Sequence, residues 1–156
     1  MVKTFRLQSV LEYRKSLEEE IQREFSELQA KLSQERELGL RIKEQICAWQ
    51  QKFHDRQKQP QGICSAEIDL YHKFLHFLTN EAARQEEKIR SLELAVEQKR
   101  QALLEARREK KIMERLREKT LILWRKDMLR EEQKLLDERA ANRRRGGSQD
   151  MADEEG

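Results

Sequence analysis

Metal binding is the one chemistry that the polar side chains of this sequence could build. His72 and His76 are four residues apart, so they share one face of a helix. In a chain that folds back on itself, His54 would lie roughly opposite His72, with Cys64 near the turn. Zinc favours imidazole and thiolate ligands, but this spacing matches no standard zinc pattern. Polar histidines are also common at hairpin tips, and we therefore expect no metal and no cofactor.

Catalysis has little support in the sequence. Glycine occurs only at positions 39, 62, 146, 147 and 156, so no glycine-rich loop can cradle a phosphate. Serine and histidine are scarce, and on exposed helices they would have no concave pocket to exclude water. We expect a protein that is not an enzyme, so any nucleotide chemistry would belong to a partner.

The elements that carry these residues are long helices, because helix breakers are nearly absent. The 83 residues from Ile63 to Arg145 contain no glycine or proline, and residues 1–59 contain only Gly39. Between them lies a compact break, QPQG at residues 59–62. With 40% charged residues and a mean hydropathy of −1.02, the chain is too polar for a compact globular core. The composition is typical of a coiled coil or of a disordered chain.

Hydrophobic periodicity favours the coiled coil. Alternating steps of four and three keep one seam of a helix facing a partner helix. In the first stretch these steps select Ile21, Phe25, Leu28, Leu32, Glu35, Gly39, Ile42, Ile46, Trp49 and Phe53. In the second they select Ile68, Tyr71, Leu75, Leu78, Ala82, Gln85, Ile89, Leu92, Val96, Lys99 and Leu103. After Leu103 the frame weakens, and it resumes with a shifted phase at Leu121, Trp124, Met128 and Leu135.

The sequence thus predicts an all-α protein, an antiparallel coiled-coil hairpin whose second helix is the longer. Paired residues should have numbers that sum to about 126. Ser65 is the predicted N-cap of the second helix. The expected organisation is a single hairpin over residues 1–145, followed by a disordered acidic tail over 146–156. The parts of the hairpin are a first helix over about 5–58, a turn over about 59–65 and a second helix over about 66–142.

Apolar residues continue beyond the part of the second helix that the first can cover. They are Leu121, Ile122, Leu123, Trp124, Met128, Leu129, Leu135 and Leu136. A single helix cannot bury that many apolar groups alone, so this segment predicts a partner. Two alternatives remain: the segment dimerises, or the first helix begins earlier or packs differently.

Charge is concentrated in the same part of the chain. Residues 99–145 carry 17 basic and 9 acidic side chains, a net charge of +8. Acidic residues interleave with the basic ones, and no recognisable nucleic-acid module is present. The segment is therefore interpreted as a solvated coiled-coil face or as a surface for an acidic protein, with nucleic acid as a weaker alternative.

Aromatic residues gather near the turn. Five of the nine aromatic residues of the chain fall in two short segments, at Trp49, Phe53, Tyr71, Phe74 and Phe77. Phe74 and Phe77 lie off the seam, so we expect them to be partly exposed, as aromatic anchors of binding surfaces are. The alternative is a thickened core at the tip of the hairpin.

Compartment signals favour a reduced, cytoplasmic protein. Cys47 and Cys64 would not face each other under the pairing rule, and no secretory cysteine pattern or signal peptide is evident. No apolar run approaches the length of a transmembrane helix.

Four stretches resemble the FliJ family, the coiled-coil component of the bacterial flagellar export apparatus. They are FRLQSVLEYR at residues 5–14, YHKFL at 71–75, ALLEARREKK at 102–111 and EQKLLDE at 132–138. The resemblance extends from about residue 4 to 145. It implies a fold similar to the central stalk subunit of rotary ATPases, and a location at the cytoplasmic face of the inner membrane through the export apparatus.

The resemblance also implies partners and sites. FliJ-like proteins are thought to insert their joined helix ends into the hexameric ring of the export ATPase FliI. Residues expected there are Leu7, Leu11, Arg107, Arg108, Lys111, Leu121, Trp124 and Met128. FliJ-like proteins also bind the cytoplasmic domain of the export gate protein FlhA, through residues on both sides of the turn. Residues at the matching positions are Ile42, Ile46, Trp49, Phe53, Phe74 and Leu78.

Escort of export chaperones is a further implied activity, without assigned residues. The membrane would be contacted only indirectly, and no nucleic acid is expected. Two other functions remain open: the analogous stalk of a virulence-type secretion system, and a general coiled-coil scaffold or nucleic-acid-binding rod.

Overall fold

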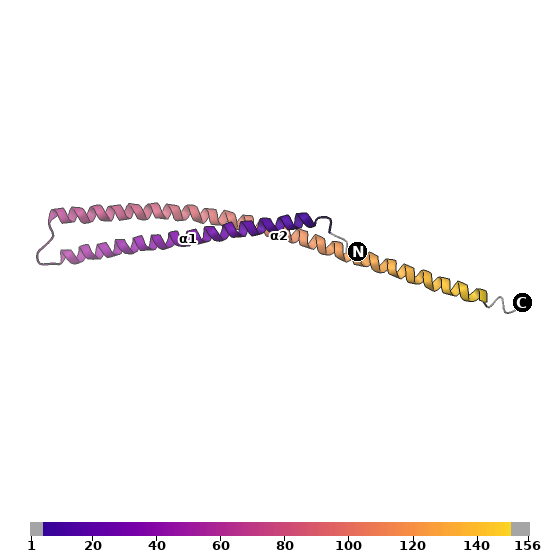
Figure 1. Ribbon diagram of the computed structural model, residues 1–156. Coiled ribbons are helices and arrows are strands. Elements are labelled where there is room, and N and C mark those ends of the chain that lie inside the picture. The colour runs from indigo at the N-terminus through magenta and orange to yellow at the C-terminus, as the bar shows by residue number, and fades with distance from the viewer. Residues whose placement is uncertain (1–4, 151–156) are drawn as a thin grey trace. The chain divides into compact units, whose positions relative to one another are not determined.

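The protein is built from two long α-helices joined by a short turn (Figure 1). The computed structural model describes residues 5–150, with side chains described as far as residue 144. Helix α1 spans Gln8–Gln57 and helix α2 spans Ser65–Asp150, and the described residues contain no strand. The all-α prediction with two long helices is confirmed. Helix α2 continues past the predicted end near residue 142, and residues 151–156 of the predicted disordered tail lie outside the described residues.

The contacts of the chain group into two units. The hairpin unit is Ser16–Arg107, and the terminal unit combines Met1–Lys15 with Arg108–Gly156. Helix α1 contributes to both units, as does α2. A single hairpin over 1–145 stays a prediction, so each unit is described by itself.

The seam of the hairpin unit follows the predicted frame. All ten predicted positions of α1 and all eleven of α2 are buried or half-buried. The helices run antiparallel in this unit, and their contacts agree with the expected pairing: Lys99 meets Glu24, whose numbers sum to 123, and Gln85 meets Glu35, with a sum of 120. Apolar steps of four and three thus placed one face of each helix against the other, as in coiled coils.

A polar layer interrupts the apolar seam near its middle. Gln85 is only 7% exposed, and its amide donates to the Glu35 carbonyl oxygen at 3.0 Å and to the Glu35 carboxylate. Gly39 lies beside this pair, where an added Cβ would stand 3.3 Å from Ile89 Cδ1 and 3.7 Å from Gln85 Cγ. The three non-apolar seam positions of this region therefore form one layer in which the buried amide is satisfied.

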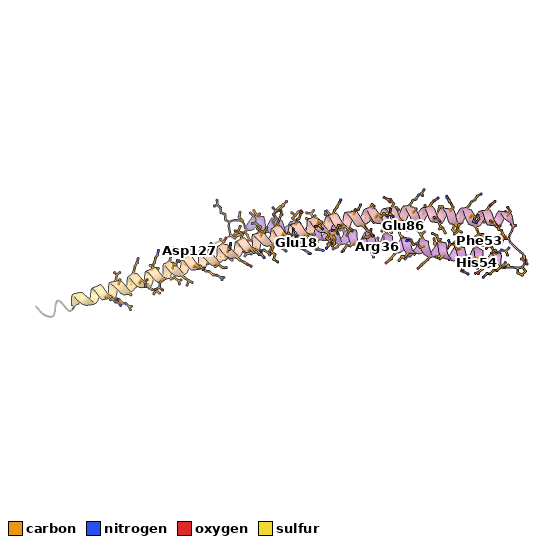
Figure 2. All side chains as sticks on the ribbon, turned by 180° about the vertical axis from the view of Figure 1, so that it is seen from behind. Glu18, Arg36, Phe53, His54, Glu86 and Asp127 are labelled. Atoms are coloured by element: carbon orange, nitrogen blue, oxygen red, sulfur yellow. The ribbon has the colours of Figure 1, made fainter. Side chains whose placement is uncertain are left out.

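Ion pairs border the seam on the surface of the hairpin unit. They join Arg36 to Glu93 at 2.6 Å, Lys43 to Glu86 at 3.1 Å and Lys99 to Glu24 at 2.6 Å. Arg36 on α1 and Glu86 on α2, both labelled in Figure 2, each belong to one of these pairs. Exposed ion pairs contribute at most about 1 kcal/mol each to stability. Their positions are consistent with the register of the two helices, but they add little to the stability of the hairpin unit.

The turn uses both breakers of the QPQG motif. Gly62 has φ 70°, a left-handed conformation that glycine adopts without the Cβ clash, and its N–H donates to the Gln59 carbonyl at 3.1 Å. Helix α2 then begins one residue earlier than predicted. Cys64, not Ser65, occupies the N-cap position, because its N–H donates to the Glu67 carboxylate at 3.4 Å and its carbonyl accepts from Ile68. In a capping box the carboxylate three residues into the helix accepts this hydrogen bond from the N-cap N–H. The prediction of Ser65 as the N-cap was therefore wrong by one residue.

The two internal glycines should respond oppositely to alanine. Gly39→Ala is expected to raise the free energy of unfolding by up to about 1 kcal/mol, the helix propensity that glycine lacks. The added Cβ needs only a small movement of the Ile89 methyl group. Gly62→Ala is expected to lower it by about 1–2 kcal/mol, since the left-handed backbone strains any L side chain. Urea unfolding followed by circular dichroism measures both, and a loss of stability in Gly39→Ala would mean that Ile89 cannot give way.

In the terminal unit the beginning of α1 packs on α2. Leu11 is completely buried, and it shares a groove with Lys15 of α1 and with Glu114, Arg117, Glu118 and Leu121 of α2. Arg14 forms an ion pair with Glu109. Leu121 and Trp124 are half-buried, as the resumed apolar frame predicted. Met128 and Leu135, the next positions of that frame, are exposed, and so is every other residue from 125 to 144.

Candidate interaction surfaces

The histidines and cysteines are spread over the tip of the hairpin unit. His76 Nδ1 lies 3.2 Å from the Asn80 amide nitrogen, and the His72 ring lies 5.6 Å from the Phe53 ring. Cys47 and Cys64 are exposed and free. Within residues 5–150, no three histidine, cysteine or carboxylate side chains come together as a group that could hold a metal ion.

Aromatic rings form a cluster at the tip of the hairpin unit. The Trp49 ring lies 4.5 Å from the Phe74 ring and 5.6 Å from the Tyr71 ring, measured between centroids. Phe53 contacts Tyr71 at 5.2 Å, and Phe74 stacks with Phe77 at 6.3 Å. Such edge-on and tilted pairs add to the stabilisation that comes from burial. The cluster joins the end of α1 to the beginning of α2, on both sides of the turn.

A groove opens beside this cluster. It has a volume of about 380 Å³ and is lined by Trp49, Glu67, Leu70, Tyr71 and Phe74. Leu70, which lines the groove, is 69% exposed, and Phe77, which stacks with the lining residue Phe74, is 56% exposed. We call the residues that line this groove, together with Phe77, the tip surface. Exposed apolar groups around half-buried aromatic rings are the usual composition of a protein-binding site.

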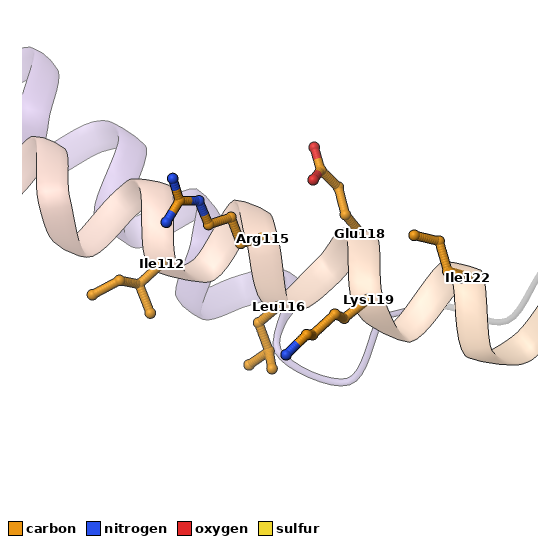
Figure 3. Close-up of a pocket in the computed structure, with 6 residues that line it drawn as sticks. All are labelled: Ile112, Arg115, Leu116, Glu118, Lys119 and Ile122. Atoms are coloured by element: carbon orange, nitrogen blue, oxygen red, sulfur yellow. The ribbon is translucent and has the colours of Figure 1, made fainter.

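A second groove lies on α2 in the terminal unit. Its volume is about 420 Å³, and it is lined by Ile112, Arg115, Leu116, Glu118, Lys119 and Ile122 (Figure 3). In Figure 3 the side chains of Ile112 and Leu116 point to the same side of α2, and the Lys119 ammonium group extends toward Leu116. The groove therefore combines three aliphatic side chains with two basic ones and one carboxylate, Glu118.

Both units have a groove lined in part by exposed apolar side chains. The family model described as Flagellar FliJ protein matches residues 3–148, nearly the whole chain. The chain belongs to the FliJ family. No curated protein and no solved structure gives a match. The family match confirms the resemblance found in the sequence, and it makes the chain a component of the flagellar export apparatus.

The structure separates the gate residues expected for this FliJ-family chain. Trp49, Phe53 and Phe74 belong to the aromatic cluster and are half-buried. Ile42 and Ile46 are half-buried in the seam, whereas Leu78 is 5% exposed and presents almost no surface to a partner. Leu70 was not among the expected residues, although its position off the seam was a signal of exposure.

The residues expected at the ATPase ring are likewise divided. Leu11 is completely buried, so its side chain holds α1 on α2 and cannot contact a ring in this arrangement. Arg107 belongs to the hairpin unit, where it donates to Glu18 at 3.2 Å and to Gln22 at 2.7 Å. The remaining members are accessible to some degree. Leu7, Arg108, Lys111 and Met128 are exposed, and Leu121 and Trp124 are half-buried.

Ile112 and Leu116 were missed by the sequence reasoning, which followed the seam. Their four-residue spacing beside basic residues was the available signal. Across residues 5–150, neither helix has a stretch that is both long and apolar enough to cross a bilayer.

Proposed function

We propose that this FliJ-family chain is a connector without catalytic activity between two parts of the flagellar export apparatus. The terminal unit engages the hexameric ring of the export ATPase FliI, and the tip surface engages the cytoplasmic domain of the export gate protein FlhA. The observation that carries the proposal is that each unit exposes large apolar side chains: Leu70 and Phe77 at the tip of the hairpin unit, and Met128, Leu129, Leu135 and Leu136 in the terminal unit.

The tip surface has the character of a binding hot spot. Trp49 and Phe74 pack against each other and line the groove, so their rings are already held in place before a partner arrives. Leu70 and Phe77 add exposed apolar area beside them. Rigid aromatic groups lose little conformational entropy on binding, which is why they dominate the energetics of many interfaces.

The terminal unit supports the second contact. Met128, Leu129, Leu135 and Leu136 are exposed on a segment of α2 in which every described side chain is exposed. A lone helix gains no stability from apolar residues that face water, whereas it gains from burying them in a partner. The net charge of +8 over residues 99–145 would favour a ring whose interior is acidic.

Coupling of this kind needs two binding surfaces and no active site. The interleaved acidic residues of the basic segment suit a protein partner better than nucleic acid. The protein would then act at the cytoplasmic face of the inner membrane, held there by its partners. Chaperone escort is compatible with the tip surface but has no residue assigned to it.

Exposed residues allow each contact to be tested without disturbing the fold. Leu70→Ser with Phe77→Ser is expected to weaken binding to the FlhA cytoplasmic domain at least about tenfold, because it removes apolar area at the tip. Met128→Ser with Leu135→Ser is expected to weaken FliI binding to the same degree and to reduce any stimulation of its ATPase rate. Biolayer interferometry with both purified partners measures the affinities.

Each double variant is the control for the other. Every variant should retain its affinity for the second partner within about twofold, as expected of surface substitutions far from an interface. The helical signal in circular dichroism should also be unchanged. If both variants lost affinity for both partners to the same degree, two separate binding surfaces would be ruled out. Exposed positions are used because truncating Trp49 or Phe74 would also remove the packing between them.

A further inference from the structure

Helix α2 carries an apolar face in the terminal unit that α1 does not cover. Ile112, Leu116 and Leu123 follow one another at steps of four and seven, so they lie on one face of the helix. We call this face, with the adjacent Ile122, the outer stripe. Ile112 is 63% exposed and Leu123 is 60% exposed. Apart from Arg108 at its edge, the outer stripe is made of residues that are not among those expected at the ATPase ring.

The contact with α1 uses another side of α2. Leu11 is buried beside Glu114, Arg117 and Leu121, which fall between the members of the outer stripe in the helical repeat. On a helix with 3.6 residues per turn, position 121 lies about 180° from position 112. The beginning of α1 therefore occupies the side of α2 away from Ile112, and the outer stripe is left open.

Unpaired cations border the outer stripe. Arg108, Arg115, Lys119 and Lys126 follow at steps of seven, four and seven, which places them along one edge of the same face. All four are exposed. Among the described residues, none of the four forms an ion pair with a carboxylate, whereas Arg14 and Arg107 do. The groove over Ile112 and Leu116 is therefore lined by aliphatic side chains, by Arg115 and Lys119, which form no ion pair among the described residues, and by one carboxylate, Glu118.

Charge decides what kind of helix fits this groove. The segment over residues 99–145 has a net charge of +8, so a second copy would bring two strongly basic segments together. Such like-charge contact is unfavourable, and an acidic partner is favoured by the same charges. The apolar side chains Ile112, Leu116 and Leu123 lie at positions i, i+4 and i+11, which share one face of the helix, as in the packing of an amphipathic helix against a partner helix.

We propose that the outer stripe is a docking site for an amphipathic helix of a partner protein, with aliphatic residues on one face and aspartate or glutamate along its edge. The aliphatic face covers Ile112 and Leu116, and the acidic edge pairs with Arg115 and Lys119. This site does not depend on the identity of the partners at the tip or at the ATPase ring.

Designed peptides of about 21 residues can test the site, since this length presents three heptads. Two peptides share one leucine stripe and carry either glutamate or lysine along its edges. Their binding to the full-length chain is followed by fluorescence anisotropy at about 150 mM salt, where long-range attraction is largely screened. The glutamate peptide is expected to bind at least about tenfold more tightly than the lysine peptide.

Substitutions then locate the site. Ile112→Ser with Leu116→Ser is expected to weaken binding of the glutamate peptide at least about tenfold. Arg115→Glu with Lys119→Glu is expected to reverse the preference between the two peptides. The matched control is Leu94→Ser, an exposed leucine of the hairpin unit, which should leave binding unchanged. The helical signal of every variant is compared with that of the parent chain.

Three results would overturn the proposal. Equal affinity for the two peptides would remove the role of charge. Retained binding in the Ile112 and Leu116 variant would place the peptide elsewhere. A dimer seen by light scattering and lost in that variant would identify the occupant as a second copy. None of these results would affect the two-ended function, whose variants leave the outer stripe intact.

Discussion

Leu11→Ala is expected to release the beginning of α1 from α2 in the terminal unit. Leu11 is the one described side chain that is completely buried, and replacing a buried leucine by alanine costs about 2–5 kcal/mol. Only residues 8–15 of α1 belong to this unit, so few other contacts oppose their release. The substitution should therefore act locally, with the hairpin unit remaining folded.

Hydrogen exchange resolved along the chain measures this effect. Amides of residues 8–15 should lose their protection in Leu11→Ala, while amides around the seam residue Leu32 keep theirs. Leu7→Ala is the matched control one turn away, because Leu7 is already exposed and should cost less than about 0.5 kcal/mol. Protection lost evenly along the whole chain would show that the two units unfold together.

The second large effect is expected at the polar layer of the seam. Gln85→Leu removes the amide that donates to Glu35 and leaves a half-buried carboxylate facing an apolar side chain. A polar group left unsatisfied costs about 1–3 kcal/mol, so the free energy of unfolding should fall by that order. The double variant Glu35→Leu with Gln85→Leu restores a continuous apolar seam. It should be at least as stable as the parent chain, as found where buried polar pairs are replaced by well-packed apolar groups.

A double-mutant cycle by urea unfolding measures the coupling between Glu35 and Gln85. Arg36→Ala with Glu93→Ala provides the comparison, because this exposed pair should contribute less than about 1 kcal/mol. A double variant as unstable as Gln85→Leu alone would contradict the interpretation. The polar layer would also set the register of the hairpin, as single polar residues do in other coiled coils.

The sequence predicted the hairpin seam well. Every position selected by steps of four and three is buried or half-buried, including Glu35, Gly39 and Gln85. This success has a local cause, because the spacing of apolar residues fixes which face of a helix can be covered. The turn was predicted for the same reason, since Pro60 and Gly62 restrict or permit backbone angles by themselves.

The candidate surfaces were predicted less completely. The aromatic tip was expected, and Phe74 and Phe77 are both partly exposed as expected, although Phe74 also packs against Trp49. Sequence patterns identified Leu78 and Leu11 as apolar, yet they could not separate a side chain that faces a partner protein from one that faces the other helix. The N-cap was placed one residue late, because the choice between Cys64 and Ser65 depends on where the Glu67 carboxylate reaches.

The sequence by itself determined the helices, the seam, the turn and membership of the FliJ family, because each follows from residue types and spacing along the chain. Only the tertiary structure decided which apolar faces are covered. Coverage depends on where the other helix lies, and α1 buries Leu11 against the Leu121 side of α2 while leaving Ile112 and Leu116 open. The tip groove beside Leu70 has the same origin, since it exists only where the aromatic rings of two helices meet.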